Sequence, residues 1–389
     1  MLIGVVGKTN TGKSTFFSAA TLVDAKIAPF PFTTIEPNIG KAYVRAPCPC
    51  KELRVRCAPK NSLCEDGTRL IPIDLIDVAG LVPDAHLGKG LGLKFLDDLR
   101  TADALIQVVD VSGTTDAEGK PCDFYDPANE IIFLEEEMSH WIAGIIKRSW
   151  SRVKGKGIDS VAGLLSGLKM SQEEVERAAA QLFLSKEEIN WSDEDILAFS
   201  KEVRKVSKPI LIAANKIDLQ SGEKNYKNLK ERFKDRILVP TCAEAELALR
   251  KATKQGSISY TPGDSDFKIL SSLPEKQLAA LNFIREKVLA PYTGTGVQEL
   301  INRAAFDLLN LIVVYPVEDE GKFSDHFGNV LPDAILLKRG STALGLAAKI
   351  HTDLAQNFIC AINARTRMRV GREYVLKNGD VIRIISSPR

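Results

Sequence analysis

The chain has 389 residues, 44% of them hydrophobic and 26% charged, which is the composition of an ordinary globular protein with two or three domains. No apolar run approaches the ~18 residues that a membrane helix needs, and no basic segment precedes the first apolar stretch. We therefore expect neither a membrane anchor nor a signal peptide. Seven cysteines, an odd number in a long chain, favour a reducing cytoplasm over a disulfide framework.

Residues 1–115 are predicted to alternate strands, turns and helices, the pattern of an α/β sheet. Three buried strands are expected here and two more after a long interruption. Their predicted ranges are 2–6, 71–78, 104–111, 209–214 and 236–240. In the interruption, 116–207, apolar residues recur at three- and four-residue steps, while Ser171 opens a capping box and Ser192 is a further N-cap. We interpret it as a helical insertion into one α/β domain, comprising 1–115 and 208–305.

The last part of the chain, 311–389, changes to short strands around one helix and is predicted to be a small α+β unit. Before it, the Gly- and Ser-rich stretch 255–266 is predicted to be a surface loop or a second small insertion, and 274–289 a helix. Residues 338–389 carry ten Lys and Arg against three Asp and Glu, an excess of +7 in a chain whose net charge is +2. This asymmetry indicates either a nucleic-acid partner or a solvated basic face.

Residues 7–14 match the pattern G-x-x-x-x-G-K-[ST] directly after a predicted strand and at the start of a helix. In that context successive backbone N–H groups and the helix N-terminus face the phosphates of a nucleotide. Lys13 is expected to bridge the β- and γ-phosphates, and Ser14 to bind Mg²⁺. The candidate phosphate-binding residues are Gly7, Lys8, Thr9, Asn10, Thr11, Gly12, Lys13, Ser14 and Thr15.

Two further motifs indicate which nucleotide base is bound and which reaction takes place. Asp77 and Gly80 form D-x-x-G at the end of a strand; Asp77 is expected to hold Mg²⁺ through water, and the Gly80 N–H to contact the γ-phosphate. Asn215, Lys216 and Asp218 form N-K-x-D after another strand. Asp218 can accept hydrogen bonds from N1–H and the 2-amino group of guanine, unless it is only a helix cap. Together the three motifs predict a GTPase, with Lys13, Asn10 and Gly80 as its catalytic groups.

The segments 31–38, 77–83 and 88–92 resemble those of the Obg-like GTPases, specifically their YchF branch. The resemblance implies a Ras-like α/β core with a helical insertion and a C-terminal β-grasp (TGS) domain associated with RNA. It also implies that Thr34, in the first switch segment, reaches Mg²⁺ and the γ-phosphate. Residues 241–244 resemble a variant of the last base-binding loop, in which the Ala243 N–H meets the guanine carbonyl and Cys242 replaces the usual serine. Many members of the branch lack the aspartate of N-K-x-D and prefer ATP, whereas Asp218 is retained here.

Hydrolysis is predicted to be slow, because Leu81 stands where small GTPases have a water-orienting glutamine. Asn10 resembles the asparagine with which some GTPases hold K⁺ against the phosphates, or it only stabilises its own turn. His86 is a further candidate for orienting water.

Two other groups of residues suggest ligands. Cys48, Cys50, Cys57 and Cys64 form C-x-C-x₆-C-x₆-C, which fits a Zn²⁺ site, free thiols or a disulfide. Arg365, Arg367 and Arg369 would lie on one face of a strand and form a phosphate-binding row. A basic run at 147–156 is either a solvated helix end or an RNA contact.

These residues predict a Mg²⁺-dependent, GTP-binding switch that acts on the ribosome or on RNA. One alternative is a P-loop ATPase of stress signalling, and another is an RNA-binding protein with a structural nucleotide. We expect a cytoplasmic monomer that binds neither DNA nor membranes, and the sequence leaves room for a protein activator.

Overall fold

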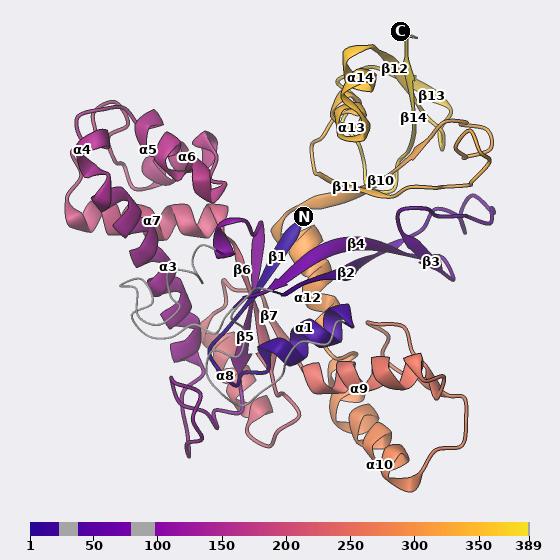
Figure 1. Cartoon of the computed structure of the whole chain (residues 1–389), viewed down its shortest axis with the longest axis horizontal. Helices are drawn as coiled ribbons and strands as arrows, with labels where there is room; N and C mark the ends of the chain where they lie inside the picture. Colours follow the sequence, from indigo (N-terminus) through magenta and orange to yellow (C-terminus); the bar gives the residue numbers. More distant parts are fainter. Residues whose placement is uncertain (23–37, 79–97, 388–389) are drawn as a thin grey trace. The chain divides into compact units, whose positions relative to one another are not determined.

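The computed structural model describes residues 1–22, 38–78 and 98–387. Contacts divide the chain into two compact units (Figure 1). Unit 1 comprises residues 1–41 and 74–300, and unit 2 comprises 42–73 and 301–389. The sequence had suggested that 42–73 belongs with the α/β domain. It groups instead with the C-terminal part because its apolar side chains share a core with strand β10 (Leu311–Val317).

The main sheet has the strand order β2-β4-β1-β5-β6-β7, with β3 paired to β4. The strands are β1 (Leu2–Val6), β2 (Asn38–Pro47), β3 (Leu63–Glu65), β4 (Thr68–Asp77), β5 (Ala104–Asp110), β6 (Ile210–Asn215) and β7 (Leu238–Thr241). All five predicted strands are confirmed within a few residues. β2 and β3 were not predicted; in β2 small residues such as Ala42 and Ala46 alternate with polar ones, which is a weak apolar signal.

The direction of the strands positions the functional residues. β1 runs parallel to β4 and β5, β5 to β6, and β6 to β7. The last residues of β4, β5 and β6 are therefore at the same edge of the sheet. These are Asp77, Asp110 and Asn215. Every residue of β5 and β6 is buried, as expected for central parallel strands covered on both faces.

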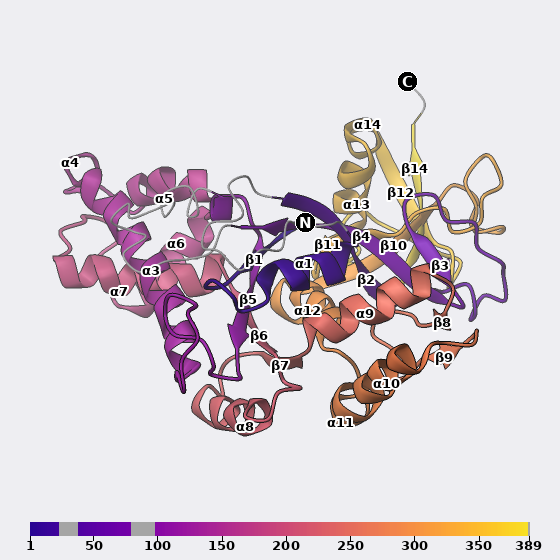
Figure 2. The ribbon, with the colours of Figure 1, turned by 60° about the horizontal axis from the view of Figure 1, so that its bottom comes forward.

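The predicted helical insertion is confirmed as a set of helices in unit 1. They are α3 (Ala128–Arg148), α4 (Trp150–Val153), α5 (Asp159–Leu165), α6 (Gln172–Gln181) and α7 (Asp193–Ser207). Ser171 and Ser192 cap α6 and α7, each in a complete capping box. Helix α7 lies against α3 and α6 (Figure 2). Their apolar faces form one core with Leu105 and Ile210 of the sheet, so the insertion packs on the α/β domain.

Further helices complete unit 1, one before the insertion and the others after it. They are α1 (Lys13–Thr21), α8 (Gly222–Arg232), α9 (Ala243–Lys254), α10 (Glu275–Ile284), α11 (Ala290–Tyr292) and α12 (Val297–Arg303), the last of which extends into unit 2. The predicted helix at 274–289 is confirmed as α10 with a π-helical turn, Arg285–Leu289. The stretch 255–266 contains β8 (Ile258–Ser259), which pairs with β9 (Lys268–Ile269). No helix among the described residues has both the length and the apolar character needed to cross a bilayer.

Unit 2 contains a five-stranded mixed sheet of order β11-β10-β14-β12-β13. Its strands are β10, β11 (Ile335–Lys338), β12 (Phe358–Asn363), β13 (Met368–Val370) and β14 (Val381–Ser386), and its helices are α13 (Ala343–Ile350) and α14 (Thr352–Gln356). Alternate residues of β10 face two cores. Ile312 and Val314 pack with α13, whereas Val313 and Tyr315 pack with residues of the 46–71 segment. This double burial explains the continuous apolar run of β10.

The predicted arginine row is wrong. Arg365 and Arg367 lie in the turn between β12 and β13, where Arg367 has a φ of 58°, so the two-residue spacing does not place them on one strand face. The Arg365 guanidinium pairs with Glu52 and donates to the Gly379 carbonyl at 3.0 Å. Arg369 donates from Nε to the Cys360 sulfur at 3.1 Å. The Arg365 and Arg369 charges are therefore held by separate contacts within unit 2.

Candidate nucleotide-binding site

The loop of residues 7–12 connects β1 to α1, and its two glycines leave no room for a side chain. Gly12 has a φ of 90°, and a Cβ there would lie 2.4 Å from Asn215 Nδ2. A Cβ on Gly7 would lie 2.5 Å from the Val108 carbonyl oxygen. The chain therefore turns tightly against β5 and β6 before α1 begins at Lys13. This is the backbone shape that a phosphate-binding loop requires.

Lys13, Ser14 and Asp77 meet at the start of α1. Lys13 Nζ lies 2.7 Å from Asp77 Oδ1, and Ser14 Oγ donates to Asp77 Oδ2 at 3.1 Å. Lys13 and Asp77 are both buried. A hydroxyl oxygen and a carboxylate side by side are the donors that Mg²⁺ prefers, so these residues fit the ion expected with a nucleotide. The Lys13 ammonium is thus held by Asp77 in this structure.

A cavity of about 240 Å³ adjoins this loop. It is lined by Gly12, Thr15, Asn215, Lys216, Asp218, Leu219, Cys242 and Glu244. Asn215 connects two loops that border this cavity. Its Nδ2 donates to the Thr11 carbonyl at 2.7 Å, and its Oδ1 accepts from the Ala243 N–H at 3.0 Å. Asp218 accepts from the Cys242 thiol at 3.2 Å. Burial, reinforced by the Asp218 charge, raises the pKa of Cys242, so this thiol remains a donor.

Two side chains of the loop make contacts other than those expected from the motif. Lys8 Nζ donates to the carbonyls of Thr115 and Asp116 and pairs with Glu130 at 2.7 Å. Asn10 Nδ2 donates to the Gly119 carbonyl at 2.8 Å. The segment after β5 therefore packs on the 7–12 loop, and the Lys8 side chain is engaged within the protein.

Sequence reasoning missed two buried acids next to these residues. Asp110 ends β5 and accepts from Lys216 Nζ at 2.7 Å; its place at the end of an apolar strand was a usable signal. Glu130 pairs with Lys8, and each side chain is only 4% exposed. Burial raises the pKa of Glu130 to about 7, although the Lys8 charge opposes the shift. Lys8 and Glu130 also line a cavity of about 350 Å³. Nothing local in the sequence distinguishes Glu130 from a surface acid at a helix start.

The remaining predicted site residues lie outside the described part of the chain or away from the cavity beside Asp218. Thr34, Gly80, Leu81 and His86 lie outside the described residues. Thr9 packs against Gly119. A Cβ added to Gly119 would lie 2.6 Å from the Thr9 carbonyl oxygen. The four clustered cysteines belong to unit 2 and do not line the cavity beside Asp218.

Family models match most of the chain. Residues 2–143 match a 50S ribosome-binding GTPase model, 213–319 match the G4 motif-containing domain of Obg-like, YGR210-like GTPases, and 327–386 match the TGS domain. These matches confirm the predicted Ras-like core and the C-terminal TGS domain.

Full-length comparisons agree with the family models. The chain is 50% identical over 396 residues to an uncharacterized GTP-binding protein of Methanocaldococcus jannaschii, covering 100% of both chains. The crystal structure of a GTP-binding protein from Pyrococcus horikoshii superposes with a TM-score of 0.81 at 44% identity, again over 100% of both chains. Human Obg-like ATPase 1 is 26% identical, covering 98% of this chain and 91% of its own.

Proposed function

We propose a guanine-nucleotide switch for this chain, which belongs to the YchF branch of the Obg-like GTPases. The observation that carries the proposal is the convergence of three sequence motifs on one edge of the sheet. Asn215, from the base motif, hydrogen-bonds both the phosphate loop and the 241–243 loop. Asp218 lines the adjoining cavity beside Thr15. A nucleotide with its phosphates at Lys13 would thus have its base beside Asp218.

Mg²⁺ would be held by Ser14 and, through water, by Asp77, with Thr34 as a further ligand. The ion would neutralise charge that develops on the phosphate oxygens. Lys13 would leave Asp77 to contact the β- and γ-phosphates, and Gly80 would sense the γ-phosphate through its N–H. These exchanges give the site two states that differ by the presence of one phosphate, as a switch requires.

We propose slow intrinsic hydrolysis, because Leu81 can neither donate nor accept a hydrogen bond. Asn10 could contribute by holding K⁺ near the phosphates, for which it would exchange its contact with the Gly119 carbonyl. That exchange would link the occupant of the phosphate loop to the segment that leads into the helical insertion.

An ATPase is the second candidate, since human Obg-like ATPase 1 is a relative of this chain. Asp218 supports guanine: two hydrogen bonds to a charged acceptor contribute about 1.5–3 kcal/mol each, so ATP should bind at least about 100-fold more weakly. Displacement of a fluorescent guanine nucleotide by GTP and by ATP measures this ratio. Similar affinities for the two nucleotides would overturn the assignment.

For the partner we propose the ribosome or RNA. The description of the N-terminal family model, a 50S ribosome-binding GTPase, and the basic excess of residues 338–389 support it. Ion pairs within the protein reduce the positive charge available to bind RNA. Arg365 pairs with Glu52, and Arg383 with Glu320. In the basic run 147–156 of the insertion, Lys147 pairs with Asp193. Co-sedimentation with ribosomal subunits, with GTP or GDP bound, tests the partner, and equal failure in both states at low salt would reject it.

A further inference from the structure

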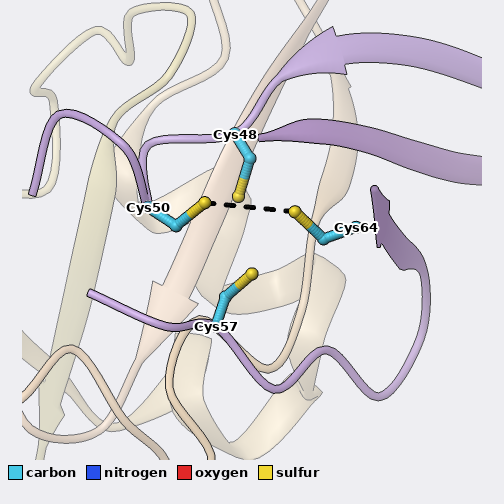
Figure 3. A group of neighbouring side chains, drawn as sticks. All are labelled: Cys48, Cys50, Cys57 and Cys64. Carbon is cyan, nitrogen blue, oxygen red and sulfur yellow. Dashed lines mark hydrogen bonds between the residues drawn. The ribbon is translucent and has the colours of Figure 1, made fainter. Parts of the chain in front are cut away.

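Four cysteines of unit 2 come together although they are spread over seventeen residues. Cys48 and Cys50 follow the end of β2, Cys57 lies in the next loop, and Cys64 is in β3. All four thiols are free, and their sulfur atoms lie within 4.8 Å of one another. Figure 3 shows the four side chains pointing toward a common centre. The sulfur atoms of Cys50 and Cys64 are 4.0 Å apart.

These separations match a metal site better than a disulfide. Four sulfurs at about 2.3 Å from a tetrahedral Zn²⁺ are about 3.8 Å from one another. A disulfide needs a sulfur–sulfur distance of about 2.05 Å. The cluster therefore needs movements of only about 1 Å or less to reach zinc geometry.

A buried positive charge beside the cluster is an independent observation. Arg69 is 0% exposed, and its Nη2 lies 3.5 Å from the Cys48 sulfur. Its other hydrogen bonds go to neutral groups, the Ser62 hydroxyl and the Leu331 carbonyl. Among the residues that the structure describes, no carboxylate lies within ion-pair distance of Arg69, and Asp333 interacts with its charge only at longer range. Burying a charge without a counter-charge is costly.

We propose that the four cysteine thiolates bind one Zn²⁺, with Arg69 as the adjacent counter-charge. Four thiolates around a divalent ion have a net charge of about −2, which would balance the buried guanidinium. Four protein ligands leave no open position, so the ion is structural. It would join the 48–64 segment to the core that contains Tyr315 and Leu331. Binding releases the thiol protons to solvent.

Metal analysis of the full-length chain, purified without chelators under reducing conditions, tests the proposal. We expect about one zinc per chain, lost in Cys57→Ser and kept in Cys122→Ser, which changes another half-buried cysteine outside the cluster. Arg69→Met removes the charge but keeps a long side chain. It should weaken zinc binding roughly 10–100-fold in a chelator competition.

The proposal would be overturned by a wild-type chain that retains no zinc after incubation with an equivalent of Zn²⁺ and desalting, or by iron as the retained metal. Equal loss of zinc from the Cys57→Ser and Cys122→Ser variants would do so as well. If Cys57→Ser does not fold, two measurements on the wild-type chain still test the zinc proposal. Titration of its thiols with a mercurial should release zinc, and Co²⁺ substitution should give the absorption of a tetrahedral thiolate site.

Discussion

The buried pair of Lys8 and Glu130 makes the stability of unit 1 sensitive to pH. Glu130, near the start of α3, lies 2.7 Å from Lys8 Nζ and accepts a hydrogen bond from the Asp110 N–H at 3.3 Å. Burial nevertheless raises its pKa from the usual 4.5 to about 7. The perturbation that tests this shift is Glu130→Gln, which keeps the shape of the side chain and removes its titration.

The sign and size of the effect follow from linkage. The folded pKa lies above the unfolded one, so the native state binds the proton more tightly. Glu130 then contributes stability that is complete below about pH 4.5 and is lost as pH rises through about 7. The difference between the two pKa values corresponds to about 3 kcal/mol. The wild-type chain should therefore lose up to about 3 kcal/mol of unfolding free energy relative to Glu130→Gln between pH 4.5 and 8.

Denaturant unfolding at intervals across this pH range, followed by tryptophan fluorescence, measures the difference between the two proteins. Burial lowers the pKa of Lys208 to about 8, but this residue is present in both proteins, so its titration cancels in the difference. Glu173→Gln, at an exposed position of α6, is the control and should follow the wild-type curve. A wild-type-minus-variant difference that is constant with pH would refute the reasoning, because it would mean that the pKa of Glu130 is the same in the folded and unfolded chains.

Three further predictions concern the nucleotide site. Asp218→Asn should weaken GTP binding by about 1.5–3 kcal/mol or more and allow xanthosine triphosphate to bind, because xanthine has a carbonyl where guanine has its amino group; unchanged GTP affinity in a titration would contradict the role of Asp218. Exchanging K⁺ for Na⁺ at constant ionic strength should slow hydrolysis, and Asn10→Ala should remove that difference while nucleotide still binds; equal wild-type rates in the two salts would exclude the cation role. Gly12→Ala should abolish nucleotide binding, since its Cβ would lie 2.4 Å from Asn215 Nδ2 and its φ of 90° disfavours any side chain; calorimetry that detects normal binding would contradict this.

The sequence by itself determined the parts of the protein whose physics is local. The loop 7–14 could be predicted because glycine spacing dictates its backbone shape, and the helices α6 and α7 because Ser171 and Ser192 satisfy their first N–H groups. The central strands were predictable because their residues are almost all apolar. Strand β2 escaped prediction because alternation between small and polar residues is a weak signal.

Only the tertiary structure decided which distant side chains meet. Lys8 and Glu130 become partners because α3 packs beside the phosphate loop, and no local pattern encodes that contact. Arg365 pairs with Glu52, 313 residues away, because a turn rather than a strand holds it. Cysteine spacing alone left zinc, free thiols and a disulfide open. The folded chain brings the four sulfurs together beside the buried Arg69, a neighbour that no local pattern in the sequence encodes.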